Sequence, residues 1–276
     1  MAIFAGSFAS SHGPLIVRDW DTLAEPLRER FNRDFREVGR RIAAARPDIL
    51  IVISPDHWVN FFLNNLPTVC IGVGAENDGP PEPFMRDFPY PTLVGDSAFG
   101  EHLLRVALKN GFDPSISHRL TLDHGFCIPL WRLELPELPR IVPVIINGLQ
   151  EPMMSIGRCL SWGHLLANAI AAYPTDERIA VLGTGGLSHS IGETTMGDVD
   201  ERFDRICLAA LERGGDDDVV QTVERELEHT GNGSHEIRNW IIAHGAAGAS
   251  RFDLIDYFPS PEVYIGCAFG AWDRAV

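Results

Sequence analysis

The sequence predicts an α/β protein, a single domain with a central mostly parallel or mixed β-sheet flanked by helices on both faces. The apolar run at residues 49–54 is rich in β-branched side chains and ends in Ser54-Pro55, which is typical of a strand buried on both faces of a parallel sheet. Residues 3–9 form a second apolar strand, and an amphipathic helix at residues 21–45 separates the two. A β-α-β crossover of this length implies parallel pairing.

The length and composition fit one domain of this kind. The chain has 276 residues, of which 45% are hydrophobic and 22% charged, so it is long enough to bury a sizeable core. It contains no internal repeat, no low-complexity tract and no convincing linker. We therefore expect residues 1–276 to form a single domain.

The remaining segments alternate in type as the fold class requires. Residues 68–73 read as a strand and lead into a Pro- and Gly-rich loop at 74–91, a length that in compact domains often marks a functional lid. A helix at 97–110 is closed by Gly111. Ser234 follows a Gly-Asn-Gly turn and is expected to cap the last helix. We expect further strands at residues 140–146, 178–182 and 262–269, and further helices at residues 156–172, 199–213, 216–229 and 235–246.

Charge and cysteine usage exclude several classes of partner. The net charge of -15 argues against nucleic acid or an anionic membrane, because both favour clustered Lys and Arg. The five cysteines are scattered, without a Cys-x-x-Cys pair, which favours reduced thiols over a disulfide framework. The sequence has no signal-peptide pattern and no apolar run near the ~20 residues that span a bilayer. We expect a cytoplasmic protein.

Four histidines lie at strand ends or in turns, where a parallel α/β fold exposes its functional loops: His12, His57, His124 and His189. For any one of them the plainer interpretation is a surface or a satisfied core residue. As a group they suggest metal binding or proton transfer. Two neutral imidazoles and one carboxylate form the facial triad of non-haem iron(II).

The carboxylates near these histidines leave two interpretations open. Glu236 lies in the first turn of a predicted helix, and the residues alone favour a charge placed against the helix dipole, worth ~0.3–1 kcal/mol. Asp56 either orients a neighbouring ligand or caps a turn. The chain has no His-x-x-x-His pair, no Gly-x-Gly-x-x-Gly loop and no Gly-x-Ser-x-Gly elbow, which argues against a metalloprotease, a nucleotide site and an α/β-hydrolase.

Seven short motifs together resemble the class III extradiol ring-cleavage dioxygenases, a superfamily that includes protocatechuate 4,5-dioxygenase β subunits and 2,3-dihydroxyphenylpropionate 1,2-dioxygenases. Each motif is weak alone, but their order along almost the whole chain is specific. The motifs are Ser11-His12-Gly13-Pro14, Ser54-Pro55-Asp56-His57-Trp58, Ile71-Gly72-Val73-Gly74, Asp123-His124-Gly125-Phe126, Ile145-Ile146-Asn147-Gly148, Gly185-Gly186-Leu187-Ser188-His189 and Ser234-His235-Glu236-Ile237-Arg238-Asn239-Trp240.

The resemblance implies a role for each candidate. His12, His57 and Glu236 would hold one iron(II), which reverses the dipole interpretation of Glu236. His189 would be the acid/base residue, since a histidine titrates near neutral pH, and His124 would be a second active-site imidazole. The implied enzyme is a single catalytic domain over residues 1–276 that inserts both atoms of O2 into a catechol-like ring and gives an open-chain semialdehyde-type product in aromatic compound catabolism.

Substrate and partners stay open at this point. The ring could be protocatechuate, gallate, a substituted catechol, an aminophenol or a hydroxypyridone, and we expect Trp58, Phe61 and Phe62 to line its pocket, although core packing is their plainer interpretation. The partners are this substrate and O2, with either a small partner subunit or a homo-oligomer, a symmetric dimer by default. The alternatives are a zinc-dependent hydrolase on the same His/Glu cluster and a non-catalytic binding protein of the same fold.

Overall fold

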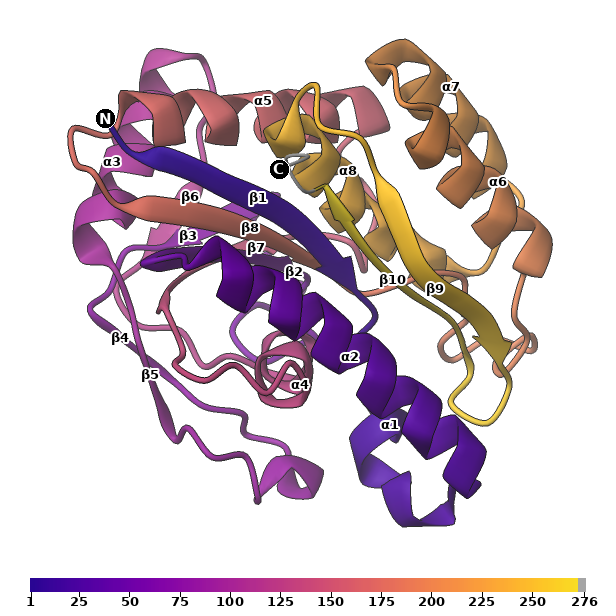
Figure 1. The fold of residues 1–276 in the computed structure, drawn as a ribbon. Helices are drawn as coiled ribbons and strands as arrows, with labels where there is room; N and C mark the ends of the chain where they lie inside the picture. Colours follow the sequence, from indigo (N-terminus) through magenta and orange to yellow (C-terminus); the bar gives the residue numbers. More distant parts are fainter. Residues whose placement is uncertain (273–276) are drawn as a thin grey trace.

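The computed structural model describes residues 1–272 and is built around one eight-stranded sheet with the strand order β6-β3-β7-β2-β8-β1-β10-β9 (Figure 1). The strands are β1 (Ile3–Ser10), β2 (Ile49–Ser54), β3 (Val69–Gly72), β6 (Ser115–Ser117), β7 (Arg140–Ile146), β8 (Arg178–Thr184), β9 (Asp253–Ser260) and β10 (Ile265–Trp272). The four neighbours β7, β2, β8 and β1 are mutually parallel. Strands β3 and β10 run antiparallel to β7 and β1, so the sheet is mixed.

The central strand β2 is buried along its whole length, as its unbroken apolar run predicts. It pairs with β7 on one side and with β8 on the other. Strands β1 and β2 are parallel, as the crossover implies, but β8 lies between them and pairs with both. Strand β8, which lies far along the chain from both, therefore fills the centre of the sheet.

Helices cover both faces of the sheet and bury one hydrophobic core on each (Figure 1). Helices α2 and α4 pack on one face, and α3, α5 and α8 pack on the other, with α6 and α7 beside them. The expected fold class is confirmed. The helices are α1 (Leu15–Arg18), α2 (Glu25–Ala45), α3 (Ser97–Lys109), α4 (His124–Arg132), α5 (Ile156–Ala172), α6 (Glu201–Arg213), α7 (Asp216–Leu227) and α8 (Ile237–Ala247), with short 3-10 turns η1 (Trp20–Thr22), η2 (Pro83–Met85) and η3 (Asn232–Glu236).

Several segments differ from the sequence-based expectation, among them α1, β6 and α4, which were not predicted. The loop expected at residues 74–91 contains β4 (Glu76–Asp78), which pairs with β5 (Thr92–Val94) in a small antiparallel ribbon. Strand β9 was not predicted, and the last strand is β10 rather than residues 262–269, because residues 261–264 form the turn between the two. Many side chains of β9, the hairpin partner of β10, are only partly buried, so its sequence lacks the apolar pattern that predicts a strand.

Ser234 does not cap the last helix. It lies inside η3, and its hydroxyl is 3.0 Å from the hydroxyl of Thr230. Helix α8 begins at Ile237 without a side-chain cap, because η3 runs directly into it. The turn that carries Glu236 is thus an extension of the helix rather than a capped start.

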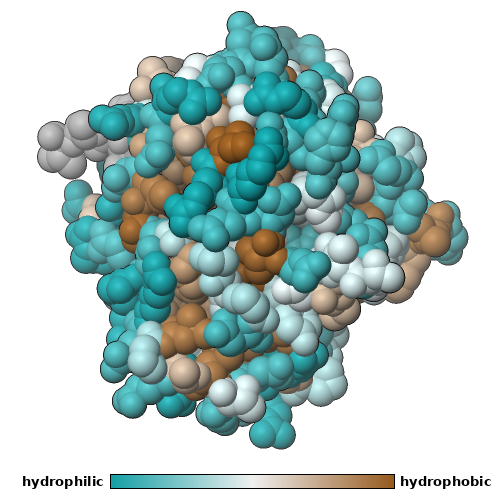
Figure 2. All heavy atoms as spheres, turned by 90° about the vertical axis from the view of Figure 1, so that its right-hand side faces the viewer, coloured by the Kyte–Doolittle hydropathy of each residue, from teal (hydrophilic) through white to brown (hydrophobic). Residues whose placement is uncertain are grey.

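The surface agrees with the composition. The face that presents α6, α7 and β9 is mainly hydrophilic, with apolar side chains only in small separate groups (Figure 2). All five cysteines are buried and free, as expected for reduced thiols. Within residues 1–272, no helix has the length and apolar character needed to cross a membrane.

Candidate active site

The parallel strands bring the four singled-out histidines to one edge of the sheet. His12, His57 and His189 follow the carboxyl ends of β1, β2 and β8, and His124 begins α4. Carboxyl ends of neighbouring parallel strands meet at the same edge, which is where open α/β sheets bind ligands. His12, His124 and His189 are no more than 9% exposed. The structure therefore gathers in a buried site residues that lie far apart in the sequence.

Three of the rings form a compact group. The centroid of the His57 ring is 5.1 Å from that of His12 and 4.1 Å from that of His124. One ligand atom from each of these three histidines lies within 4.8 Å of the others, a spacing at which they could hold a metal ion. Imidazole nitrogen is a common ligand of iron and zinc.

Glu236 joins this group from η3. Its Oε2 is 3.3 Å from Nε2 of His12, and its Oε1 is 3.3 Å from Nε2 of His57. The same Oε1 is 3.9 Å from Nε2 of His189. Since Glu236 is 2% exposed, both carboxylate oxygens face histidine nitrogens rather than bulk water.

A glycine makes room for this carboxylate. The backbone N–H of Gly186 donates to Oε2 of Glu236 at 2.6 Å. At Gly185, φ is +100°, and a Cβ there would lie 2.5 Å from Oε2 of Glu236 and 2.9 Å from the His12 ring. Both the backbone conformation and the space require glycine at position 185. The Gly185-Gly186 pair is therefore part of the site.

His12 and His189 each donate their Nδ1–H to a neutral acceptor. Nδ1 of His12 is 3.0 Å from the hydroxyl of Thr184, which itself donates to the carbonyl of Ile53, so the hydroxyl oxygen accepts from His12. Nδ1 of His189 is 3.0 Å from the carbonyl oxygen of Leu187, which can only accept. In their neutral forms both rings therefore present an unprotonated Nε2.

His57 and His124 donate Nδ1–H to carboxylates. Nδ1 of His57 is 3.1 Å from Oδ2 of Asp123, and Nδ1 of His124 is 2.8 Å from Oε1 of Glu82. Such outer carboxylates fix the ring orientation and raise the basicity of the nitrogen that faces a metal. All four histidines thus leave Nε2 as the available nitrogen.

Burial and charge act against each other in this group. Burial alone would lower the pKa of His57, but the carboxylates of Asp123 and Glu236 outweigh it and raise the pKa to about 10. Burial opposes the ionisation of Glu236, yet His12 and His189 hold its pKa well below the usual range. Burial and the charge of His57 lower the pKa of His124. A metal cation at Glu236 would have to displace the proton of His57, because a ligating imidazole nitrogen must be free of its proton.

Of the two roles left open for Asp56, the structure supports the turn cap. Its carboxylate accepts hydrogen bonds from the backbone N–H groups of Val59, Asn60 and Phe61 at 3.0 to 3.1 Å. The carboxylate that accepts from Nδ1 of His57 is Asp123 instead. Sequence reasoning missed this role of Asp123, although the residue lies in the Asp-His-Gly-Phe motif.

Glu82 was also missed. It lies in the loop at 74–91, which was expected to be functional, and its Oε1 accepts from both the backbone N–H and the ring of His124. Nothing local to Glu82 marks it, because its partner is 42 residues away. The loop supplies a fixed contact to the site.

The segment that carries His189 is held on two sides. The backbone N–H and the hydroxyl of Ser188 donate to the buried carboxyl of Asp204 at 2.8 and 2.9 Å. On the other side, the N–H of Gly233 donates to the carbonyl of His189, and a Cβ at Gly233 would lie 2.1 Å from the His189 ring. These contacts leave His189 little freedom to turn away from Glu236.

The histidines and Glu236 lie at the base of a cavity of about 450 Å³, in the size range of small-molecule sites. Trp58 lines this cavity, as expected for a substrate-binding residue. The expectation for Phe61 and Phe62 is wrong in this structure. Phe61 packs against the hydrophobic core, and Phe62 is 51% exposed on an outer hollow that it shares with Trp58, because the turn capped by Asp56 directs them away.

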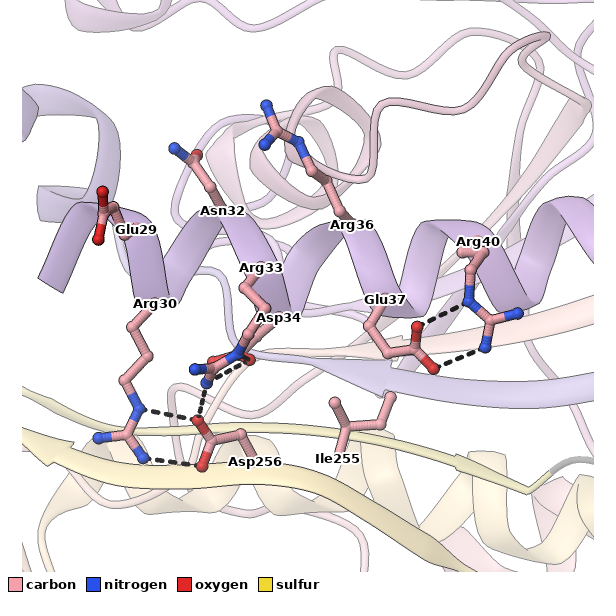
Figure 3. A pocket seen from close by; sticks show the side chains of 10 residues that line it. All are labelled: Glu29, Arg30, Asn32, Arg33, Asp34, Arg36, Glu37, Arg40, Ile255 and Asp256. Carbon is pink, nitrogen blue, oxygen red and sulfur yellow. Dashed lines mark hydrogen bonds and ion pairs between the residues drawn. The ribbon is translucent and has the colours of Figure 1, made fainter. Parts of the chain in front are cut away.

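A larger hollow lies between α2 and β9, but most of its charged side chains pair with one another (Figure 3). Arg30 donates two hydrogen bonds to Asp256 at 2.7 and 2.8 Å, and Arg40 donates two to Glu37 at 2.7 and 2.8 Å. This hollow resembles a solvated ion-pair surface rather than a catalytic site.

Comparison with known proteins adds independent evidence. A family model described as the catalytic LigB subunit of aromatic ring-opening dioxygenase matches residues 6–264. The chain is 30% identical to a protein of Klebsiella pneumoniae (strain 342) named 2,3-dihydroxyphenylpropionate/2,3-dihydroxicinnamic acid 1,2-dioxygenase, over 93% of this chain and 94% of the relative. It is 25% identical to a protein of the same name from Rhodococcus rhodochrous, over 91% of this chain and 92% of the relative.

Among solved structures, the chain is similar to that of an uncharacterised protein from Escherichia coli K12. The TM-score is 0.66 at 14% sequence identity, and the match covers 96% of this chain and 98% of the other. At this identity the likeness shows the fold alone.

The mixed sheet, with imidazoles and a buried carboxylate at the ends of its parallel strands, defines an α/β protein with a site suited to a metal. The chain belongs to the LigB family, the catalytic subunits of aromatic ring-opening dioxygenases. The resemblance noted in the sequence and the expected enzyme class, an extradiol ring-cleavage dioxygenase, are thereby confirmed.

Proposed function

We propose that residues 1–276 act as one catalytic domain, a non-haem iron(II) extradiol dioxygenase whose metal ligands are His12, His57 and Glu236. The observation that supports this most is the pair of 3.3 Å distances from the Glu236 oxygens to Nε2 of His12 and of His57. Two ligands held at right angles by metal bonds of about 2.1 Å lie about 3 Å apart, so the spacing fits one shared ion. Two imidazoles and one carboxylate leave other positions for substrate and O2.

His124 is assigned a different role from the three ligands. Its ligand atom lies within 4.8 Å of those of His12 and His57, whereas Glu236 places one oxygen 3.3 Å from Nε2 of each of these two histidines. Its ring also lies beside that of His57, with 33° between the ring planes. The carboxylate of Glu236 would also balance part of the charge of a divalent cation, whereas the neutral imidazole of His124 would not. We assign His124 to hydrogen bonding with the substrate or with oxygen.

The chain's own residues account for proton transfer. Bound iron(II) would supply positions for both ring oxygens and for O2, and a route for electron density between them. His189 holds its Nδ1–H on the carbonyl of Leu187, so its unprotonated Nε2 is free to take a proton from a ring hydroxyl. The same nitrogen later returns a proton to an oxygen of the product. Burial of the site limits competing proton exchange with water.

We propose a catechol-like substrate, with an open-chain semialdehyde-type product that contains both atoms of O2. The names of the relatives, which specify 2,3-dihydroxyphenylpropionate, support an aromatic ring with adjacent hydroxyls. We further propose a cytoplasmic homodimer. Five buried free cysteines favour a reducing compartment, and a symmetric dimer is the commonest assembly.

The test is oxygen uptake by protein reconstituted anaerobically with iron(II), measured against catechols, gallates, aminophenols and hydroxypyridones. We expect uptake with one ring class and a new absorbance from the ring-opened product. Zinc-loaded protein is the control and should consume no O2. Equal turnover with zinc, or hydrolysis without O2, would favour the hydrolase instead. Iron-loaded protein that consumes no O2 with any ring would contradict the proposal.

A further inference from the structure

The walls of the active-site cavity are apolar, in contrast to its base. Four of the side chains that line the cavity are large, apolar and exposed at 38 to 54%, so the apolar lining continues to the cavity mouth: Trp58, Ile191, Met196 and Tyr264. Deeper in the cavity, further aliphatic side chains come from three separate parts of the chain: Leu15, Leu149, Val263 and Ile265. A volume of about 450 Å³ holds more than a bare catechol ring, so the walls contact whatever substituent the ring carries.

One cationic side chain interrupts this lining. Within residues 1–272, Arg18 at the end of α1 is the only Lys or Arg that lines the cavity. Its Nε and Nη2 donate to the two carboxylate oxygens of Asp19 at 2.8 and 2.9 Å. This is the two-point geometry with which arginine also binds a ligand carboxylate. The hydrogen bonds to Asp19 raise the pKa of Arg18 and lower that of Asp19, so both groups are charged at neutral pH.

Asp19 therefore takes up the two donors, Nε and Nη2, with which Arg18 would otherwise bind a ligand carboxylate. An anionic substituent would have to displace Asp19 from Arg18 or remain unpaired against aliphatic side chains, which is unfavourable. The net charge of -15 also opposes an anion. An alkyl or aryl substituent avoids these unfavourable terms, and its transfer from water to the apolar cavity is favourable.

We propose that the cavity selects catechols with an uncharged, apolar ring substituent, and that Asp19 enforces this selection by occupying Arg18. The inference deepens the proposed function and rests on it. It sets this chain apart from the relatives whose names specify a propionate side chain. Asp19 acts here as a specificity residue and takes no part in the chemistry.

The experiment compares 3-propylcatechol with 3-(2,3-dihydroxyphenyl)propionate, which differ mainly in whether the side chain ends in a methyl group or a carboxylate. For the iron-loaded enzyme we expect kcat/KM to be at least about tenfold higher for 3-propylcatechol, the size of effect that an uncompensated hydrogen bond to a charged group produces. In Asp19→Asn the ratio of the two kcat/KM values should fall about twofold to fivefold, the range that an exposed ion pair supplies, because Arg18 is then available to the propionate. Arg18→Gln in that background should restore the original ratio.

Asp21→Asn is the matched control, since it removes the same charge from an exposed residue two positions away and should leave the ratio unchanged. Anaerobic binding of the two catechols is measured in parallel and should show the same preference without turnover. Absence of turnover with both rings would count against the proposed function, whereas the binding ratio still tests the selection. Preference of the native protein for the propionate, or an equal change in Asp21→Asn, would overturn the inference.

Discussion

The cavity at the strand ends and the hollow along α2 both place carboxylates beside nitrogen-bearing side chains, but they arrange these groups in opposite ways. The hollow is larger, about 1020 Å³ against about 450 Å³. In the hollow, arginines and carboxylates satisfy each other at the surface, as Arg30 and Asp256 do (Figure 3). In the cavity, each imidazole is paired on its outer nitrogen, and the inner nitrogens of His12, His57 and His189 face Glu236.

This difference shows that the direction in which polar atoms point, rather than the volume of a cavity, distinguishes a site that can bind a ligand from a charged surface. Exposed ion pairs are worth about 0–1 kcal/mol each, and their charges have no binding capacity left. A buried carboxylate facing several imidazole nitrogens is instead prepared to bind a cation. Substitutions of the same chemical type in the two regions should therefore have very different effects.

The largest effect is expected from Glu236→Gln. The substitution keeps the shape of the side chain but removes the anionic ligand, so we expect iron binding and O2 uptake to fall below detection. Iron content after gel filtration of the loaded protein measures this directly. Glu37→Gln in the hollow is the matched control and should leave both unchanged. Full iron occupancy in the Glu236→Gln protein would show that Glu236 is not a metal ligand.

His189→Ala should have the next largest effect. A proton-transfer residue typically contributes 10²- to 10⁴-fold, so we expect kcat to fall by about that factor while iron content stays near that of the native protein. Single-turnover kinetics together with metal analysis separates the two quantities. If iron were lost together with activity, His189 would be a ligand rather than the acid/base residue.

Asp123→Asn should have an intermediate effect. Loss of the carboxylate that accepts from Nδ1 of His57 should lower iron affinity about 10–100-fold, the usual range for such outer partners. A competition titration with a chelator measures the affinity. Asp56→Asn is the comparison, because Asp56 caps a turn and should affect thermal stability more than iron affinity. If Asp56→Asn lowered iron affinity while Asp123→Asn mainly lowered thermal stability, the roles assigned to the two residues would have to be exchanged.

The smallest effect on activity is expected from Asp34→Asn in the hollow. Burial raises the pKa of Asp34 to about 7, against the lowering effect of Arg33. The folded state then binds more protons than the unfolded state between about pH 4 and 7, so this contribution to stability is present at low pH and lost as the pH rises through 7. Asp34→Asn should flatten the pH dependence of the unfolding midpoint and leave O2 uptake unchanged. An unaltered midpoint profile from pH 4 to 8 would contradict this account.

The sequence by itself determined the parts of the protein that depend on local pattern. The buried run of β2 fixed the sheet, because a strand covered on both faces needs continuous apolar side chains. Since parallel strands end at one edge, the positions of His12, His57 and His189 after predicted strands or turns marked them as candidates, without showing which of them meet. Helix α5 and strand β7 were predicted with the bounds that the structure has.

Only the tertiary structure decided which atoms meet. The outer partners Thr184, Asp123 and Glu82 lie 42 to 172 residues from their histidines, and hydrogen bonds over such separations leave no periodic signal in a sequence. The proposed ligand set likewise depends on η3, which brings Glu236 to the ends of β1 and β2. The physical reason is that periodicity reports which face of an element is buried, whereas the chemistry depends on the direction of single polar atoms across distant elements.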